Sequence, residues 1–432
     1  MVLGKYFALA ATVMTMLCAC LVLPTAAENT VEAVSPALEI LAEQSRMAKA
    51  AITGEDVVFS AEDFERALNV SRVSSLTVTS VPARADGILY LGDSEVSEGQ
   101  VISRANISYL KFVFMNEEIT DSVFCFSTDL GAYDIKCAMY SLEYKNERPV
   151  VSSANGAALS VGTYKDVTVY GKLDAYDPEG DAMVYEIIDY PDAGILMLTD
   201  KAAGDYKYIP SNGYTGKDSF RYVAVDRYGN YSASATVTLE VTQQSNSLVY
   251  CDLEGSASHV AAISLTESGI MASAELGGKY YFYPSAEVTR AEFLAMAMKT
   301  LGIENLMSEE TTVFADDDQI PEEYRGYINT AQKLGYVCGR INEAGELVFA
   351  PNEAVTRAEA ATMVYNMMSL DIPVIKPLFV DLGTVPVWAT DAVYAMTSAG
   401  IMSYSGGYVV ADSAVTRGQC AEMLYMLSKL DK

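Results

Sequence analysis

The sequence is poor in basic residues and in the side chains that most catalytic and metal sites use. Its 432 residues hold 29 lysines and arginines against 57 aspartates and glutamates, and the formal net charge is −28. This balance argues against a nucleic acid partner, because phosphate binding needs a basic surface. The single histidine, His259, leaves no histidine-based catalytic or zinc site visible. We therefore expect a protein that is not an enzyme.

Long apolar runs are absent after the N-terminus. The first 27 residues combine Lys5, an apolar run and small residues before a polar stretch, which predicts a secretory signal cleaved after Ala27. A second interpretation takes Cys20 of "LCAC" as a lipidated residue. No later run is long and charge-free enough to span a bilayer, so no transmembrane anchor is expected after cleavage.

Cysteine is scarce too. Without Cys18 and Cys20, five of the seven cysteines remain: Cys125, Cys137, Cys251, Cys338 and Cys420. An odd number cannot pair completely within one chain, and no spacing indicates zinc. Cys125 and Cys137 flank a possible hairpin, so two alternatives stay open for them, a cross-strand disulfide or buried free thiols.

The hydrophobic pattern divides the chain into several domains. Residues 28–52 predict a helical stalk or linker. Residues 53–147 and 148–243 consist of short alternating runs bounded by turn residues, which is typical of antiparallel β-sandwiches. From about Leu248 the period changes from two to three or four and predicts helices. The expected fold is two all-β sandwiches followed by an all-α module.

The helical part repeats itself. "VTRAE" occurs twice and "VTRGQ" once, with arginines at 290, 357 and 417, so the steps are 67 (357−290) and 60 (417−357) residues. Each unit opens with an aromatic residue two positions before an aspartate: Asp252, Asp316 and Asp381. This self-similarity predicts three stacked helix–loop–helix units, at residues 248–303, 304–370 and 371–432.

The repeated arginine lies at a helix start. The Thr-x-x-Glu pattern predicts a capping box, which Gln419 can also close in the third copy. The box does not explain the arginine, since the helix dipole disfavours a cation there by roughly 0.3–1 kcal/mol. Two interpretations remain: pairing with local carboxylates, or recognition of an anionic extracellular ligand through the guanidinium fork. Three occurrences at one register favour recognition.

The repeat resembles the S-layer homology (SLH) domain. The segment "VFADDDQIPEEYRGYINTAQKLGYVCGRINEAGELVFAPNEAVTRAEAATMVYNMM" matches its whole length, and the flanking copies match less fully. The resemblance implies a pseudo-trimeric helical module, in the cell wall or S-layer of a bacterium, whose grooves bind secondary cell-wall polysaccharide, often pyruvylated. The polysaccharide-binding residues that it implies are Arg290, Arg357, Arg417, Asp252, Asp316, Asp381 and Trp388.

The helical module also departs from the SLH pattern. The positions that correspond to Trp388 hold Glu323 and Ala257, and the third copy has "TRGQ" where the family prefers "TRAE". Unequal grooves are therefore expected.

The second β segment resembles bacterial cadherin-like or immunoglobulin-like domains, through "AYDPEGDAMVYEI" and "AVDRYGN", and the first segment resembles a more divergent member. Four acidic residues are candidate ligands for Ca²⁺, the one cofactor considered: Asp174, Asp177, Asp181 and Asp226. The alternative, a type I turn with Asp177 at its first position, is favoured.

These features predict a secreted cell-surface protein that is held non-covalently by wall polysaccharide. Its β domains would act as a spacer or as an adhesive surface for another surface protein or glycan. The alternative is a carbohydrate-binding or scaffold protein whose β domains hold the main ligand.

Overall fold

The computed structural model describes residues 46–151, 159–246, 248–304, 306–307, 311–368 and 378–430. The chain divides into two compact units, Met1–Lys145 and Asn146–Lys432, each described by itself below. The predicted signal peptide lies outside the described residues. Across the described ranges, no helix is long and apolar enough to cross a membrane.

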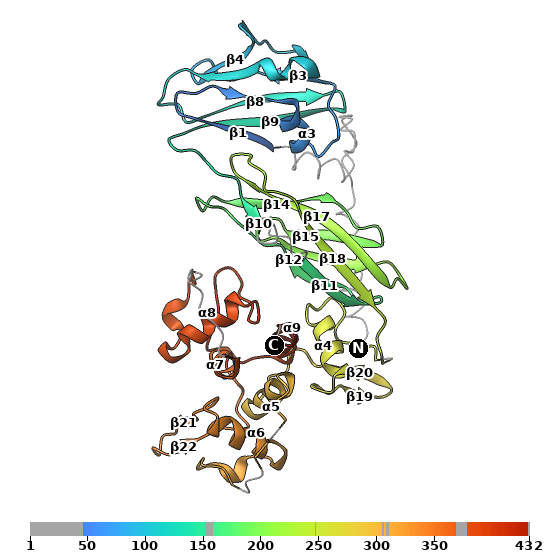
Figure 1. The fold of residues 1–432 in the computed structure, drawn as a ribbon, viewed down its shortest axis with the longest axis vertical. Coiled ribbons are helices and arrows are strands. Elements are labelled where there is room, and N and C mark those ends of the chain that lie inside the picture. Colours follow the sequence, from blue (N-terminus) through green and yellow to red (C-terminus); the bar gives the residue numbers. More distant parts are fainter. Residues whose placement is uncertain are drawn as a thin grey trace, which may run out of the picture. The chain divides into compact units, whose positions relative to one another are not determined.

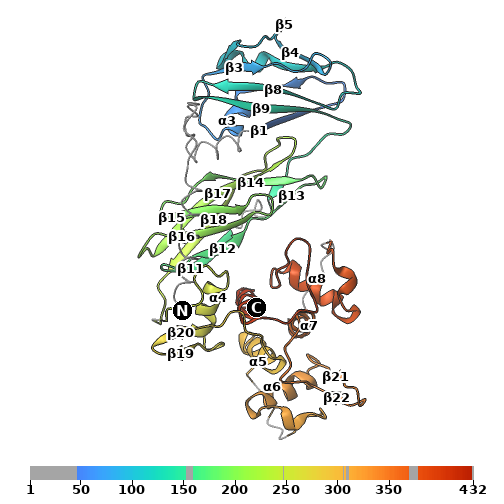
Figure 2. The ribbon, with the colours of Figure 1, turned by 180° about the vertical axis from the view of Figure 1, so that it is seen from behind.

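The first unit is a β-sandwich with a short helix (Figures 1 and 2). One sheet has the order β1-β9-β8-β3-β6 and contains β1 (Arg46–Ile52), β9 (Gly131–Leu142), β8 (Asp121–Thr128), β3 (Ser75–Ser80) and β6 (Val101–Ser103). The other sheet contains β2 (Val57–Val58), β7 (Leu110–Phe114), β4 (Gly87–Leu91) and β5 (Ser94–Glu95), in that order. Helix α3 (Ala61–Ala67) starts from a capping box at Ser60, and η1 (Arg104–Tyr109) precedes β7. Phe64, Phe112 and Phe124 are fully buried in the core.

The helix predicted over residues 28–52 is wrong where the structure describes it. Residues 46–52 form β1, which pairs in parallel with β9 from Arg46 opposite Lys136 to Ile52 opposite Leu142. The sequence "RMAKAAI" has local helix propensity, but β9 offers a row of backbone partners and Met47 is buried in the core. Tertiary pairing overrides the weak local preference.

The register of β8 and β9 settles the alternatives for Cys125 and Cys137. Phe124 lies opposite Cys137, whereas Cys125 lies opposite Lys136. Successive side chains of a strand point to opposite faces, so the two sulfurs lie on different faces of the sheet and cannot be bonded to each other. The five cysteines of the described ranges are free thiols. The disulfide alternative is therefore wrong.

The β part of the second unit is also a sandwich. A four-stranded sheet contains β11 (Leu159–Tyr164), β18 (Ala235–Thr242), β17 (Gly216–Asp226) and β14 (Met183–Asp189), in that order. A three-stranded sheet contains β12 (Val169–Lys172), β16 (Asp205–Pro210) and β15 (Gly194–Asp200), and β10 (Val150–Val151) pairs with β13 (Ala175–Tyr176). Strand β18 alternates buried and exposed residues, as its sequence predicts. Tyr208 and Phe220 are buried in the core.

The rest of the second unit is the helical module. Its α-helices are α4 (His259–Glu267), α5 (Arg290–Thr300), α6 (Glu322–Lys333), α7 (Arg357–Met368), α8 (Thr390–Ser398) and α9 (Arg417–Lys429). Smaller elements are β19 (Ala274–Leu276), β20 (Lys279–Tyr281), β21 (Arg340–Ile341), β22 (Leu347–Val348), η3 (Asp317–Gln319), η4 (Leu382–Thr384) and η5 (Val387–Ala389).

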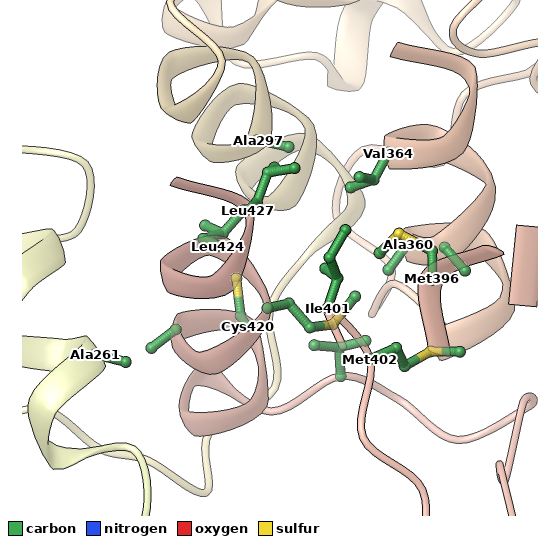
Figure 3. Close-up of a cluster of buried hydrophobic side chains, with 14 of the residues drawn as sticks. Ala261, Ala297, Ala360, Val364, Met396, Ile401, Met402, Cys420, Leu424 and Leu427 are labelled. Carbon is green, nitrogen blue, oxygen red and sulfur yellow. The ribbon is translucent and has the colours of Figure 1, made fainter. Parts of the chain in front are cut away.

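The helices pack between repeats rather than within them. α5 packs on α6, α7 on α8, and α9 returns to α4, so the last repeat closes onto the first (Figures 1 and 2). Figure 3 shows the resulting core, in which side chains of several helices point toward one another, among them Ala297 of α5, Val364 of α7 and Leu424 of α9. All three are fully buried.

Candidate functional site

The three Val-Thr-Arg segments meet in a closed ring of backbone hydrogen bonds. The N–H of Val288 donates to the carbonyl of Val415 (3.0 Å), Val415 to Val355 (2.8 Å), and Val355 to Val288 (2.9 Å). The N–H of each motif arginine donates to a carbonyl of the neighbouring repeat at 2.7–2.9 Å, namely those of Glu353, Ser413 and Ala286. Helix-start amides have no partner inside their own helix, so the neighbouring repeat satisfies them.

The predicted capping boxes are present at all three helix starts. Thr289 accepts from the amide of Glu292 and Thr416 from that of Gln419, both at 3.3 Å, and each N3 side chain accepts from its threonine amide. In the second copy, Glu359 Oε2 accepts from the Thr356 amide at 3.1 Å. Glutamine thus replaces glutamate without loss of the cap.

Each motif arginine extends its side chain to a loop of the next repeat in the ring. Its Nε donates to a carbonyl located eight residues before the next motif arginine. The pairs are Arg290 with Phe349 (2.9 Å), Arg357 with Val409 (2.8 Å) and Arg417 with Phe282 (2.9 Å). The arginine therefore joins neighbouring repeats, a role that the sequence analysis did not foresee. No residue type marks the acceptor in the sequence, because any residue can supply a backbone carbonyl.

The three aspartates hold the same loops from inside each repeat. Asp316 accepts from the amides of Phe349 (2.8 Å) and Ala350 (2.7 Å), and Asp252 and Asp381 bind the corresponding amides of their own repeats. The second amide belongs to a residue with left-handed backbone, at φ 57° for Ala350, 56° for Tyr283 and 52° for Val410. A positive φ is strained for residues other than glycine, and the hydrogen bonds to the aspartate stabilise the loop in this conformation.

The three arginines differ in their charge environment. Arg290 is 4% exposed, and its Nη1 lies 2.8 Å from Glu359 Oε1. For Arg290, the structure thus shows the first of the two interpretations given above, pairing of the motif arginine with a nearby carboxylate. Burial lowers the pKa of Arg290, and the charge of Glu359 opposes that shift. Arg340 also binds Glu359, so two cations share one carboxylate.

Arg357 and Arg417 have no such ion pair among the described residues. Arg357 is 5% exposed and donates to the carbonyls of Val409 and Ser403. Burial lowers its pKa, and the charges of Glu422 and Asp381 act in the opposite direction. Arg417 is half-exposed and donates to the carbonyls of Phe282 and Ala272, both at 2.9 Å.

Trp388 lies in η5, is 59% exposed, and belongs to an element that packs on α7. The corresponding Glu323 and Ala257 are also exposed.

Gly418, which makes the third motif "TRGQ", has a local reason: a Cβ there would lie 3.2 Å from both the Pro284 carbonyl and Ser258 Oγ. The family's alanine would be tight at that place.

The acidic residues of the second β domain form turns. The Gly180 amide donates to the Asp177 carbonyl at 3.1 Å, and Asp177 Oδ1 accepts from the amides of Glu179 and Asp181. Asp226 similarly accepts from Tyr228 and Asn230, and the Asp174 carbonyl accepts from Tyr222. Within the ranges that the structure describes, no three acidic, histidine or cysteine side chains are arranged to hold a metal ion. The turn that the sequence analysis favours is present, and Ca²⁺ binding stays the untested alternative.

Family models match both parts of the second unit. The bacterial Ig domain matches residues 146–242, and the S-layer homology domain matches residues 313–361. The chain thus carries an immunoglobulin-like domain and an SLH domain, as the sequence predicted. The SLH domain indicates association with the cell surface or wall.

Two curated relatives share a segment of 88 residues with the chain. An amylopullulanase of Thermoanaerobacterium thermosulfurigenes is 38% identical, and exoglucanase XynX of Acetivibrio thermocellus is 33% identical, each over 20% of this chain. The matches span 4% and 8% of those relatives' lengths. Among solved structures, human CDH23 EC21-23 matches over 46% of this chain and 72% of its own, at 16% identity and a TM-score of 0.21. Nothing about this chain follows from so low a score.

Proposed function

We propose that the protein is a secreted bacterial surface protein, held non-covalently in the wall by its helical module. The ligand is an anionic secondary cell-wall polysaccharide, with a pyruvyl carboxylate as the charged group. The observation that carries the proposal is the set of three inter-repeat arginines, two of which contact no carboxylate among the described residues. A guanidinium bound only to neutral carbonyls keeps its charge available to an anion.

The two β-sandwich domains act as a spacer or as an adhesive surface toward another surface protein or glycan. The chain itself is not an enzyme. The activities that the names of the two relatives indicate belong to proteins of which the chain spans a small fraction, and the match gives no reason to transfer them.

Sedimentation of the full secreted chain with purified cell walls tests the anchoring proposal. We expect the chain to pellet with walls that carry their polysaccharide and to stay in the supernatant with walls from which it has been extracted. Arg417→Ala should weaken pelleting, since this arginine is the most accessible of the three. Equal pelleting with extracted walls would show that the anionic polymer is not the ligand.

A further inference from the structure

The interface between the first and second repeats already holds a carboxylate against its motif arginine. Glu359 Oε1 lies 2.8 Å from Arg290 Nη1, and the same oxygen accepts from Arg340 at 2.8 and 2.9 Å. The side chains of Arg290 and Glu359 are 5% and 13% exposed. A carboxylate placed on the guanidinium is the contact that an anionic sugar would have to make. Glu359 therefore competes directly with such a ligand.

The other two interfaces lack this contact. Glu359 is the N3 residue of α7, and the N3 residue of α9 is the neutral Gln419. The N3 residue of α5, Glu292, caps Thr289 through Oε2 as Glu359 caps Thr356, but among the described residues it forms no ion pair with an arginine. In the described part of the chain, neither Arg357 nor Arg417 forms an ion pair. The same helix position thus gives three different charge environments.

We propose that Glu359 closes the first-to-second interface to the anionic polysaccharide, and that the ligand's carboxylate binds at Arg357 and Arg417. The proposal rests on the proposed function of the module. The carboxylate-bearing sugar therefore has two sites on each chain, and Glu359 sets that number.

The direct test is Glu359→Gln in the full secreted chain. Glutamine keeps the cap, as Gln419 does in α9, and a buried motif arginine bound only to carbonyls is already tolerated at Arg357. Isothermal titration with oligosaccharides released from the wall polymer should count three sites in place of two. Carboxyl-reduced oligosaccharides, in which the carboxylate has become an alcohol, should bind to neither protein.

The matched control is Glu353→Gln. Glu353 pairs with Arg340 but not with Arg290, and its side chain is 64% exposed. This variant loses the same charge from the same repeat, so it should keep two sites. Arg290→Ala alone should also keep two sites, whereas Arg290→Ala combined with Glu359→Gln should lose the additional one.

The reciprocal variant is Gln419→Glu, which places a carboxylate toward Arg357 while keeping the capping box. It should remove one site, and it tests the inference even if Glu359→Gln proves unstable. Unchanged site counts in both variants, or a site lost on Arg290→Ala alone, would overturn the role of Glu359. If the unaltered chain binds no oligosaccharide, the proposed function itself fails, and that result is distinct from a chain that binds but ignores Glu359.

Discussion

At the scale of single residues, one loop peptide in each repeat is held from two sides. In the third repeat, Asp381 accepts from the amides of Val409 and Val410, and Arg357 of the second repeat donates to the Val409 carbonyl. Burial raises the pKa of Asp381, but the two amides and the charge of Arg357 outweigh it, so the net shift is downward. The carboxylate is thus stabilised in its charged form, and this stabilisation would be lost as the pH falls through its folded pKa.

Arg357→Glu should destabilise the module strongly. A carboxylate at this buried position would face the carbonyl oxygens of Val409 and Ser403, at a cost of about 3–5 kcal/mol. Thr356→Ala removes a helix cap and should cost roughly 0.5–2 kcal/mol. Trp388 is the single tryptophan of the chain, so its fluorescence in a urea titration reports this module alone. A smaller loss for Arg357→Glu than for Thr356→Ala would show that the carbonyl contacts add little.

Val410→Gly should stabilise the same loop. Val410 is 52% exposed and has φ 52°, a conformation that a β-branched residue rarely adopts and glycine adopts freely. Relief of the strain should raise the free energy of unfolding by up to about 1 kcal/mol. Val380→Gly is the control, since Val380 is 67% exposed and is absent from the left-handed residues. It should give no gain, and a gain of equal size there would contradict the strain argument.

At the scale of elements, the register of paired strands and the burial of each element decide which cysteines can form a disulfide or react with a thiol reagent. Cys137 is buried, Cys125 lies on the opposite face of the sheet, and Cys420 is buried in α9. Burial raises the pKa of Cys420 to about 12, and it also raises that of Cys137. Buried thiols of this kind are poor nucleophiles.

Thiol titration should therefore separate the cysteines by element. Cys251 and Cys338 are exposed and should react quickly in the folded chain, while Cys137 and Cys420 should react only after unfolding. In denaturant without reductant, all five cysteines of the described ranges should react. Fewer reactive thiols, together with a mass lower by the two hydrogens of a disulfide, would contradict the β8–β9 register.

The turn between β13 and β14 provides a second test at this scale. Asp177 Oδ1 and Asp226 Oδ1 accept amides of their own turns, whereas the buried Asp177 Oδ2 has no hydrogen-bond partner among the residues that the structure describes. Calorimetric melts of the full chain in CaCl2 and in EDTA should superimpose, with MgCl2 as the control for ionic strength. A specific calcium site occupied at a hundredfold excess over its Kd would instead add about 2.7 kcal/mol. A rise in melting temperature in calcium alone would establish the site.

At the scale of the whole molecule, the helical module is a closed ring. α4 of the first repeat packs on α9 of the third, and the three valines are linked in a cycle of hydrogen bonds. A ring of this kind has no independent repeat, because each N-terminal helix buries its apolar face on the preceding repeat.

Deletion of residues 371–432 should therefore unfold more than the third repeat. It would expose buried residues of α4, such as Val260 and Ile263, and leave Arg357 without its acceptors. We expect loss of the cooperative helical melt followed by circular dichroism, and rapid proteolysis of residues 248–370. Removal of the first unit, Met1–Lys145, is the control and should leave that melt unchanged. A sharp helical transition in the truncated chain would contradict the ring.

The sequence by itself determined what depends on neighbours along the chain. The capping boxes join residues three positions apart, and the hydrophobic period identifies strands and helices from short windows. The repeated motif likewise indicated an SLH domain, which a family model matches at residues 313–361, and the register of the three arginines. The caps and the hydrophobic period depend on short windows, and the repeat is found by comparing segments of one chain, so none of these signals requires knowledge of the tertiary contacts.

Only the tertiary structure decided the partners of those arginines. Arg357 and Arg417 bind carbonyls that lie 52 and 135 positions away, and any residue can supply a backbone carbonyl. Tertiary contacts also decide three other features: the pairing of Arg290 with Glu359, the strand formed by residues 46–52, and the sheet faces on which Cys125 and Cys137 lie. Contacts between distant segments depend on ring closure and strand register, which leave no trace in local propensity.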